Sequence, residues 1–151
     1  MDKRTKIAWG CALAGVGLMV AGSLLSDDSS SVSDVRGWYS SGGAIKLSNL
    51  RDDFGSIQTD ANAEDVSSLY DDCVQLSTDV DAARSFKEIP DSETQNHWGA
   101  ALGHFDKAAD YCKSGTSSMD INQINESSVE MADGQAELVK ATARLMTMTS
   151  N

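Results

Sequence analysis

Apolar residues recur at intervals of three and four along most of this chain, and this spacing constrains the fold more than any other feature of the sequence. The clearest run comprises Val66, Leu69, Cys73, Leu76, Val80 and Ala83. Such spacing places the side chains on one face of an α-helix. The 151 residues include a single proline, Pro90, so few points break a helix and long helices are expected.

Four helices are expected after residue 38. The first carries Leu47, Leu50, Phe54 and Ile57 on one face. The second is the run from 66 to 83, with Asn62 available as its N-cap because a short polar side chain can accept a bond from the first backbone N–H groups. The third begins after Pro90 with Asp91 as its N-cap.

The inward face of the third helix, and then that of the fourth, follow the same spacing. The third carries Trp98, Ala101, Leu102, Phe105, Ala108 and Cys112. The fourth opens at Asp120, with Gln123 at the spacing of a capping box. It carries Ile121, Ile124, Met131, Leu138 and Leu145, interrupted by Ser128, Gln135 and Thr142. No segment alternates like a strand, so the sequence predicts an all-α domain, an antiparallel four-helix bundle over residues 38–148.

The N-terminus predicts a membrane anchor. The basic residues Lys3, Arg4 and Lys6 precede an uncharged run from Ile7 to Leu25, which as a helix would be about 28 Å long and could cross the hydrocarbon layer. Positive charge before such a segment stays in the cytoplasm. We therefore expect a cytoplasmic tail (1–6), a transmembrane helix in the lipid bilayer (7–25) and an outside domain, as in a single-pass cell membrane protein.

A cleaved signal peptide is the alternative for the same segment. Small residues at 21–23 suit a signal peptidase, and cleavage would make the domain a secreted protein. Retention is favoured because the apolar run exceeds the usual length of a signal peptide core. Residues 26–37, rich in Ser and Asp, are expected to form a flexible spacer.

Charge limits the partners of the outside part. Beyond the anchor the chain has 9 basic and 22 acidic residues, a formal net charge of -13. Such a charge repels phosphate backbones, so nucleic acid is not expected as a partner. The same charge keeps an external domain soluble.

Two cysteines lie outside the predicted anchor, Cys73 and Cys112, and an external pair is usually a disulfide. In a simple hairpin, Cys73 would lie about 17 Å before the end of its helix at Arg84, and Cys112 about 32 Å after the start of the next helix. The two cysteines come level only if residues 85–90 are extended and overshoot the second helix. The bridge therefore predicts a non-helical linker there.

His97 and His104 are the only histidines and are weak ligand candidates. Seven residues separate them, about 10.5 Å along a helix, which is too far for both to hold one metal ion. A hydrogen-bonded role is favoured. A haem held by His104 and a methionine, such as Met131, Met146 or Met148, is the alternative that a bundle allows. No metal and no cofactor are expected.

No catalytic motif is present in the sequence. It contains no Gly-x-Ser-x-Gly elbow, no His-Glu-x-x-His pair and no Lys-bearing phosphate loop after Ser41-Gly42-Gly43. Its paired aspartates are typical of the solvated faces of amphipathic helices. We expect no catalytic residues and no enzyme activity.

Trp38 and Tyr39 form an unusual aromatic pair directly before residues 40–43, which read Ser-Ser-Gly-Gly. Exposed aromatic residues anchor interfaces, so the pair is a possible interaction surface. The favoured interpretation is that the pair fastens the start of the first helix to the bundle, since apolar residues before a helix commonly do so.

The chain resembles an uncharacterised family of small actinobacterial proteins that are secreted or membrane-anchored. The resemblance runs from Trp38 to about Leu145 and implies a helical fold and an extracytoplasmic address, but no activity. It also implies that Cys73 and Cys112 belong together. The residues that carry it are Trp38, Tyr39, Gly42, Gly43, Cys73, Leu76, Asp79, Val80, Ile89, Pro90, Asp91, His97, Trp98, Ala101, Leu102, Ala108, Ala109, Cys112, Gly134, Leu138 and residues 141–144.

Together these features predict a membrane-anchored, non-catalytic module of the cell envelope that interacts with an unknown protein partner. The alternative function is a four-helix bundle that binds a small ligand or haem.

Overall fold

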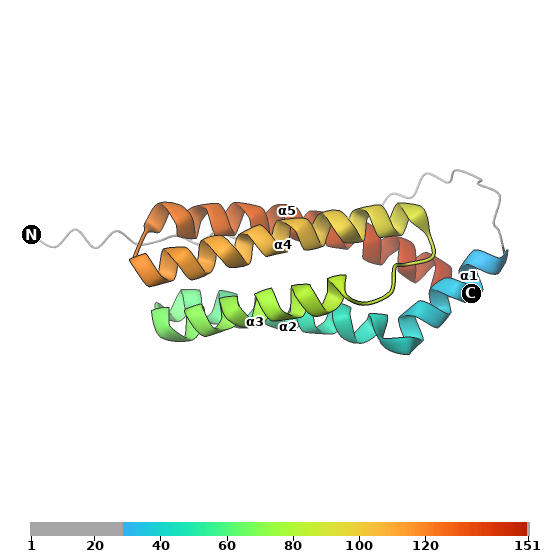
Figure 1. Cartoon of the computed structure of the whole chain (residues 1–151), viewed down its shortest axis with the longest axis horizontal. Helices are drawn as coiled ribbons and strands as arrows, with labels where there is room; N and C mark the ends of the chain where they lie inside the picture. Colours follow the sequence, from blue (N-terminus) through green and yellow to red (C-terminus); the bar gives the residue numbers. More distant parts are fainter. Residues whose placement is uncertain (1–28, 151) are drawn as a thin grey trace, which may run out of the picture.

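The computed structural model describes residues 29–150 (Figure 1). Over this range the chain forms α1 (Ser29–Trp38), a π-helical turn η1 (Tyr39–Gly43), α2 (Ala44–Ala63), α3 (Val66–Arg84), α4 (Ser92–Ser118) and α5 (Ile121–Thr149). No strand occurs between residues 29 and 150. The expected all-α fold is therefore confirmed, with α2 to α5 as the four expected helices.

The four long helices form two hairpins that lie on each other. Figure 1 shows α2 and α3 in one layer and α4 and α5 in the other, with the two tight turns at the same end. α4 packs along α5 and against α3, and α3 packs against α2. At the other end lie α1, the linker after α3 and the end of α5 (Figure 1). α1 packs against α5 there.

Aspartate begins three of the helices. The carboxylate of Asp91 accepts from the backbone N–H of Thr94 at 2.9 Å, as expected. The carboxylate of Asp120 accepts from Asn122, and the Gln123 side chain bonds to that carboxylate at 3.2 Å instead of closing a capping box on the backbone.

The predicted N-cap of α3 is wrong. Asn62 lies inside α2, which continues to Ala63 and ends at Glu64 in a left-handed conformation with φ 57°. Asp65 caps α3 instead, accepting from the backbone N–H of Ser68 at 3.1 Å.

The inward faces of the helices are largely as predicted. The buried predicted residues are Leu47, Leu50, Ile57, Leu69, Cys73, Leu76, Val80, Ala83, Trp98, Ala101, Leu102, Phe105, Ala108, Cys112, Met131, Leu138 and Leu145. Ile121 is exposed, at 42 %. On α5 the core positions between the large residues are Ser127, Gly134 and Ala141, so the face is continuous but built partly from small residues.

Those small residues let α5 approach α4 closely. A Cβ atom at Gly134 would collide with the ring of Phe105. The hydroxyl of Ser127 donates to the backbone carbonyl of Ala108 at 2.7 Å, so its buried polar atom is satisfied. The contact between α4 and α5 is therefore tight.

The disulfide and its linker agree with the prediction. The Cα atoms of Cys73 and Cys112 are 5.9 Å apart and the two sulfurs are bonded. The linker from 85 to 91 is not helical, which brings the two cysteines level. Ile89 is buried in it, and the ring of Phe86 packs edge-on against Trp38, with centroids 5.9 Å apart.

The predicted flexible spacer is wrong over residues 29–37, which belong to α1. Val35 and Trp38, three residues apart, are both buried, and they give this short helix an apolar edge. The prediction gave weight to the Ser and Asp content and missed that edge. Gly42, with φ 140°, then turns the chain into α2, and the Phe86 ring lies over it.

The predicted cytoplasmic tail, anchor and residues 26–28 of the spacer lie outside the described residues. Between residues 29 and 150, none of the helices has the length and apolar character needed to cross a membrane.

Candidate ligand-binding groove

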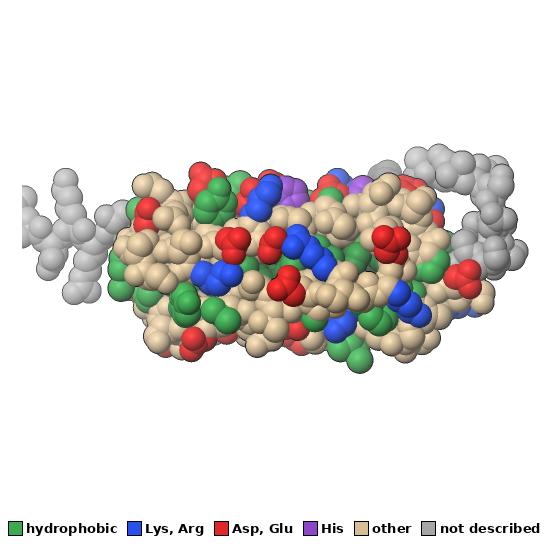
Figure 2. All heavy atoms as spheres, in the orientation of Figure 1, with side chains coloured by type: hydrophobic (Ala, Val, Ile, Leu, Met, Phe, Trp, Pro, Cys, Tyr) green, Lys and Arg blue, Asp and Glu red, His purple; other side chains and the backbone are tan. Residues whose placement is uncertain are grey.

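The structure places both histidines in contacts between α4 and α5. Nδ1 of His97 lies 2.5 Å from the Glu137 carboxylate, and Nδ1 of His104 lies 2.6 Å from that of Glu130. Each ring N–H thus donates to a separate glutamate. Together with Lys140, His97 lowers the pKa of Glu137, the lysine having the larger effect. Figure 2 shows histidine side chains along the edge formed by these helices.

These contacts show a hydrogen-bonded role for both histidines. Within residues 29–150, no group of three or more His, Cys, Asp or Glu side chains is arranged to hold a metal ion. Neither histidine lines the cavities described below. The bond to Glu130 uses Nδ1 of His104 and leaves its Nε2 atom able to act as a ligand, so the haem alternative stays a prediction.

The aromatic pair separates into two roles. Trp38 is 1 % exposed, packs edge-on against Trp98 with centroids 6.0 Å apart, and donates from Nε1 to the carbonyl of Lys87 at 2.7 Å. Trp38 therefore fastens α1 and the linker to the bundle, and its prediction as an interaction surface is wrong. Tyr39 is 41 % exposed and borders a cavity.

Two cavities with shared walls form a groove between α2 and α5. The first has a volume of about 280 Å³ and is lined by Tyr39, Ala44, Leu47, Ser48, Arg51, Thr142, Leu145, Met146 and Thr149. The second has a volume of about 370 Å³ and is lined by Arg51, Phe54, Gln135, Leu138, Val139, Thr142, Ala143 and Met146. Both are near the lower limit for small-molecule sites. We call the pair the α2–α5 groove.

The groove exists because α2 and α5 are each held by another helix. α2 packs on α3 and α5 packs on α4, while short side chains at Thr142 and Ala143 leave space between α2 and α5. The ring of Phe54 is fixed against Phe105, with centroids 4.6 Å apart, and forms part of the wall. The space is thus set by ordered helices.

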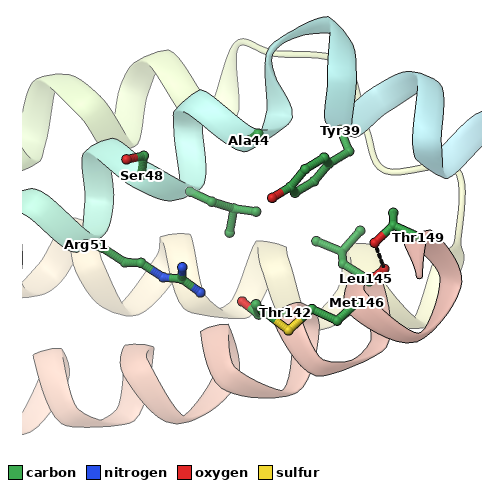
Figure 3. Close-up of a pocket in the computed structure, with 9 residues that line it drawn as sticks. Tyr39, Ala44, Ser48, Arg51, Thr142, Leu145, Met146 and Thr149 are labelled. Carbon is green, nitrogen blue, oxygen red and sulfur yellow. Dashed lines mark hydrogen bonds between the residues drawn. The ribbon is translucent and has the colours of Figure 1, made fainter.

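The polar groups of the groove are few. Figure 3 shows Tyr39 and Arg51 reaching into the first cavity from opposite ends, with Leu145 and Met146 along the α5 side. No hydrogen bond or ion pair joins Arg51 to another residue between 29 and 150. Thr142 and Thr149 donate to carbonyls of their own helix, at 2.7 and 2.8 Å. Arg51 is therefore available to a ligand.

An acidic cluster lies between α2 and α3. Burial and the neighbouring Asp79 raise the pKa of Asp53 to about 7, and one of its carboxyl oxygens is buried without a hydrogen-bond donor. Burial and Asp60 raise the pKa of Asp72 to about 6. Asn49 and Gln75 both donate to Asp79. Asp53 thus lies close to Asp79, and Asp72 close to Asp60. Both contacts favour the protonated form of the carboxyl group.

The opposite electrostatic arrangement joins α4 to the end of α5. Arg144 donates to both carboxylate oxygens of Asp91, and this bond together with the cap to Thr94 holds the pKa of Asp91 well below its usual range. A guanidinium and a carboxylate match each other's geometry in this way. The contact ties the start of α4 to the last turns of α5.

Sequence reasoning did not find the groove, although one signal was present. Arg51 follows Leu47 by four residues and precedes Phe54 by three, so it shares a helical face with apolar residues. A cation on such a face is unusual for a simple core.

Comparison of the chain with models of protein families, with curated proteins and with solved structures gives no match.

Proposed function

We propose that this chain is a membrane-anchored, extracytoplasmic, non-catalytic binding module, and that its ligand lies in the α2–α5 groove. The observation that carries the proposal is a preformed, mostly apolar groove with a cation, Arg51, in its wall that has no hydrogen bond or ion pair within residues 29–150. Ligand sites generally combine apolar walls with a small number of polar groups.

The address rests on two features. The run from Ile7 to Leu25 with basic residues before it has the length and polarity of a single-pass anchor. The bonded cysteines Cys73 and Cys112 suit an oxidising compartment, where disulfides persist. Both features support an extracytoplasmic address for the bundle.

The anchor would also orient the groove. Only residues 26–28 separate Leu25 from the start of α1 at Ser29, and the four Cα-to-Cα steps from Leu25 to Ser29 span at most about 14 Å. The end of the bundle that carries α1 would therefore face the bilayer. Tyr39 and Thr149 line the groove at this end, so a ligand from the membrane would meet it there.

The groove has the chemistry of binding. Its threonine hydroxyls donate to backbone carbonyls, and the hydroxyl of Ser48 donates to Asp52 at 3.5 Å. No histidine is among the lining residues to act as a base for these hydroxyls.

The experiment uses the full chain in phosphatidylcholine nanodiscs and a neutral photoreactive alkyl probe. Ala143→Trp places an indole in the second cavity, whereas Ala132→Trp adds one to an exposed site on the same helix that does not line it. We expect adducts on peptides of α2 and α5 in the native chain and in Ala132→Trp, and a loss in Ala143→Trp. Equal labelling of both variants would contradict the proposal.

A further inference from the structure

We infer that the ligand of the α2–α5 groove is a single-chain carboxylic acid, held by Arg51 through its carboxylate. The inference rests on the proposed function and specifies the chemistry of the ligand. The two cavities differ in polarity in the way such a molecule requires.

The first cavity suits the head of the ligand. It contains the hydroxyl of Tyr39 and the guanidinium of Arg51, which Figure 3 shows pointing toward the space between them. The guanidinium offers several N–H donors in a planar fork that matches a carboxylate. In a chain with a net charge of -11, this arginine, which has no ion pair within residues 29–150, gives the groove a local attraction for an anion.

The second cavity suits the tail. Its lining residues include Phe54, Leu138, Val139 and Met146, together with Arg51. Val139 and Met146 are 64 % and 58 % exposed, so a tail that covered them would remove apolar surface from water. The stretch of α5 from Gln135 to Met146 is about 16 Å long, which fits an extended chain along the helix.

Other ligands fit the groove less well. A neutral lipid leaves Arg51 without a partner, and an amine would be repelled by it. A phosphate monoester carries more charge than one arginine compensates, and the next charged residue along α2 is Asp52, which lines the adjoining hollow with Arg51. Of the two cavities only the second is lined mostly by apolar surface, so a lipid with two chains would have to place its second chain elsewhere.

The test compares two photoreactive probes on the full chain in phosphatidylcholine nanodiscs. One is palmitic acid with a diazirine in its chain, and the other is the alcohol with the same chain. Adducts are mapped by mass spectrometry to the peptides of α2 and α5. We expect the acid to label the groove in preference to the alcohol, and Arg51→Gln to reduce labelling by the acid about tenfold, as for the loss of a charge-assisted hydrogen bond.

Two further variants control the experiment. Lys46→Gln removes the same charge from a half-buried position of α2 that lines neither cavity and should leave acid labelling unchanged. Arg51→Lys keeps the charge but loses the fork, and we expect an intermediate reduction. Intact disulfide and helix content in each variant confirm that it is folded.

The outcomes separate this inference from the proposed function. Equal groove labelling by acid and alcohol, unaffected by Arg51→Gln, would overturn the carboxylic acid but keep the groove as an apolar site. No groove labelling by either probe in the native chain would overturn both. An equal reduction by Lys46→Gln and Arg51→Gln would show a general effect of charge and also overturn the inference.

Discussion

The two sides of α5 differ in how closely they approach the neighbouring helix. Toward α4, Gly134 and Ser127 allow a contact so close that a Cβ atom at Gly134 has no room. Toward α2, Thr142 and Ala143 face a groove. Small residues therefore have opposite consequences on one helix. A small residue opposite a large ring closes a contact, whereas small residues opposite a helix that is held elsewhere leave a space.

The comparison extends to how the layers are joined. The layers are bonded covalently between α3 and α4 by Cys73 and Cys112, whereas α2 and α5 border the groove. The closed side supplies stability, and the open side is free to bind a ligand.

The largest effect is expected from the disulfide. Replacing Cys73 and Cys112 together by Ala should lower the free energy of unfolding by about 4 kcal/mol, because the bridge restricts the unfolded chain over a separation of 39 residues. Urea unfolding of the full chain in nanodiscs, followed by circular dichroism, measures it. Cys11→Ala is the control and should have no effect on this transition. An unchanged unfolding transition in the double variant would contradict the claim that the α3–α4 side stabilises the bundle more than the α2–α5 side.

The tight side is tested by Gly134→Leu. The added side chain must displace the Phe105 ring, so we expect a loss of about 3 kcal/mol in the free energy of unfolding. Gly103→Leu is the matched control, because nothing lies within 4 Å of a Cβ atom there. That variant should gain up to about 1 kcal/mol from helix propensity. Similar effects of the two substitutions in urea unfolding would refute the close contact.

The α2–α3 interface should respond to pH. The pKa of Asp53 is about 7 in the folded chain against an ordinary 3.8, so its contribution to stability is complete below about pH 4 and is lost as the pH rises to about 7. Asp53→Asn should therefore raise the free energy of unfolding at pH 8 by roughly 2 kcal/mol and flatten its dependence between pH 4 and 7.

The measurement is urea unfolding at a series of pH values. Asp133→Asn, an exposed position on α5, is the control and should keep the native pH dependence. If Asp53→Asn also kept the native pH dependence, the contact between Asp53 and Asp79 would not be the cause of that dependence. Asp91 has the opposite effect, because its pKa is lowered in the folded chain. Its contribution to the free energy of unfolding is present above the ordinary pKa of an aspartate and is lost as the pH falls below it.

The smallest effect is expected at the histidines. His104→Gln removes a partly exposed contact with Glu130 and should lower the free energy of unfolding by about 1 kcal/mol at most. Groove labelling by the alkyl probe should be unchanged. A loss of labelling, or a Soret band in the native chain with added haem that disappears in this variant, would favour the haem alternative.

Periodicity was sufficient to predict the part of the fold that depends on large apolar residues. The run from Leu69 to Ala83 and the face from Trp98 to Cys112 are buried as expected. The disulfide required a non-helical linker after Arg84, and that local prediction is confirmed because it followed from chain geometry.

The failures occur where small or polar residues carry the pattern. α1 was missed because Ser and Asp outnumber its two core residues, Val35 and Trp38. The core face of α5 was ambiguous because Ser127 and Gly134 occupy it. The groove depends on the distance between α2 and α5, which do not pack closely against each other. The spacing of apolar residues along one helix gives no information on the distance to another helix.

The most direct test of the central claim is to identify what the full chain carries when it is isolated from its own membrane in native lipid. Extracts of the native chain and of Ala143→Trp are compared by mass spectrometry after equal amounts of protein are denatured. We predict that the extract of the native chain contains a single-chain acid in nearly the same molar amount as the protein. The extract of Ala143→Trp should lack this acid. Equal amounts with both chains, or none with either, would contradict a ligand in the α2–α5 groove.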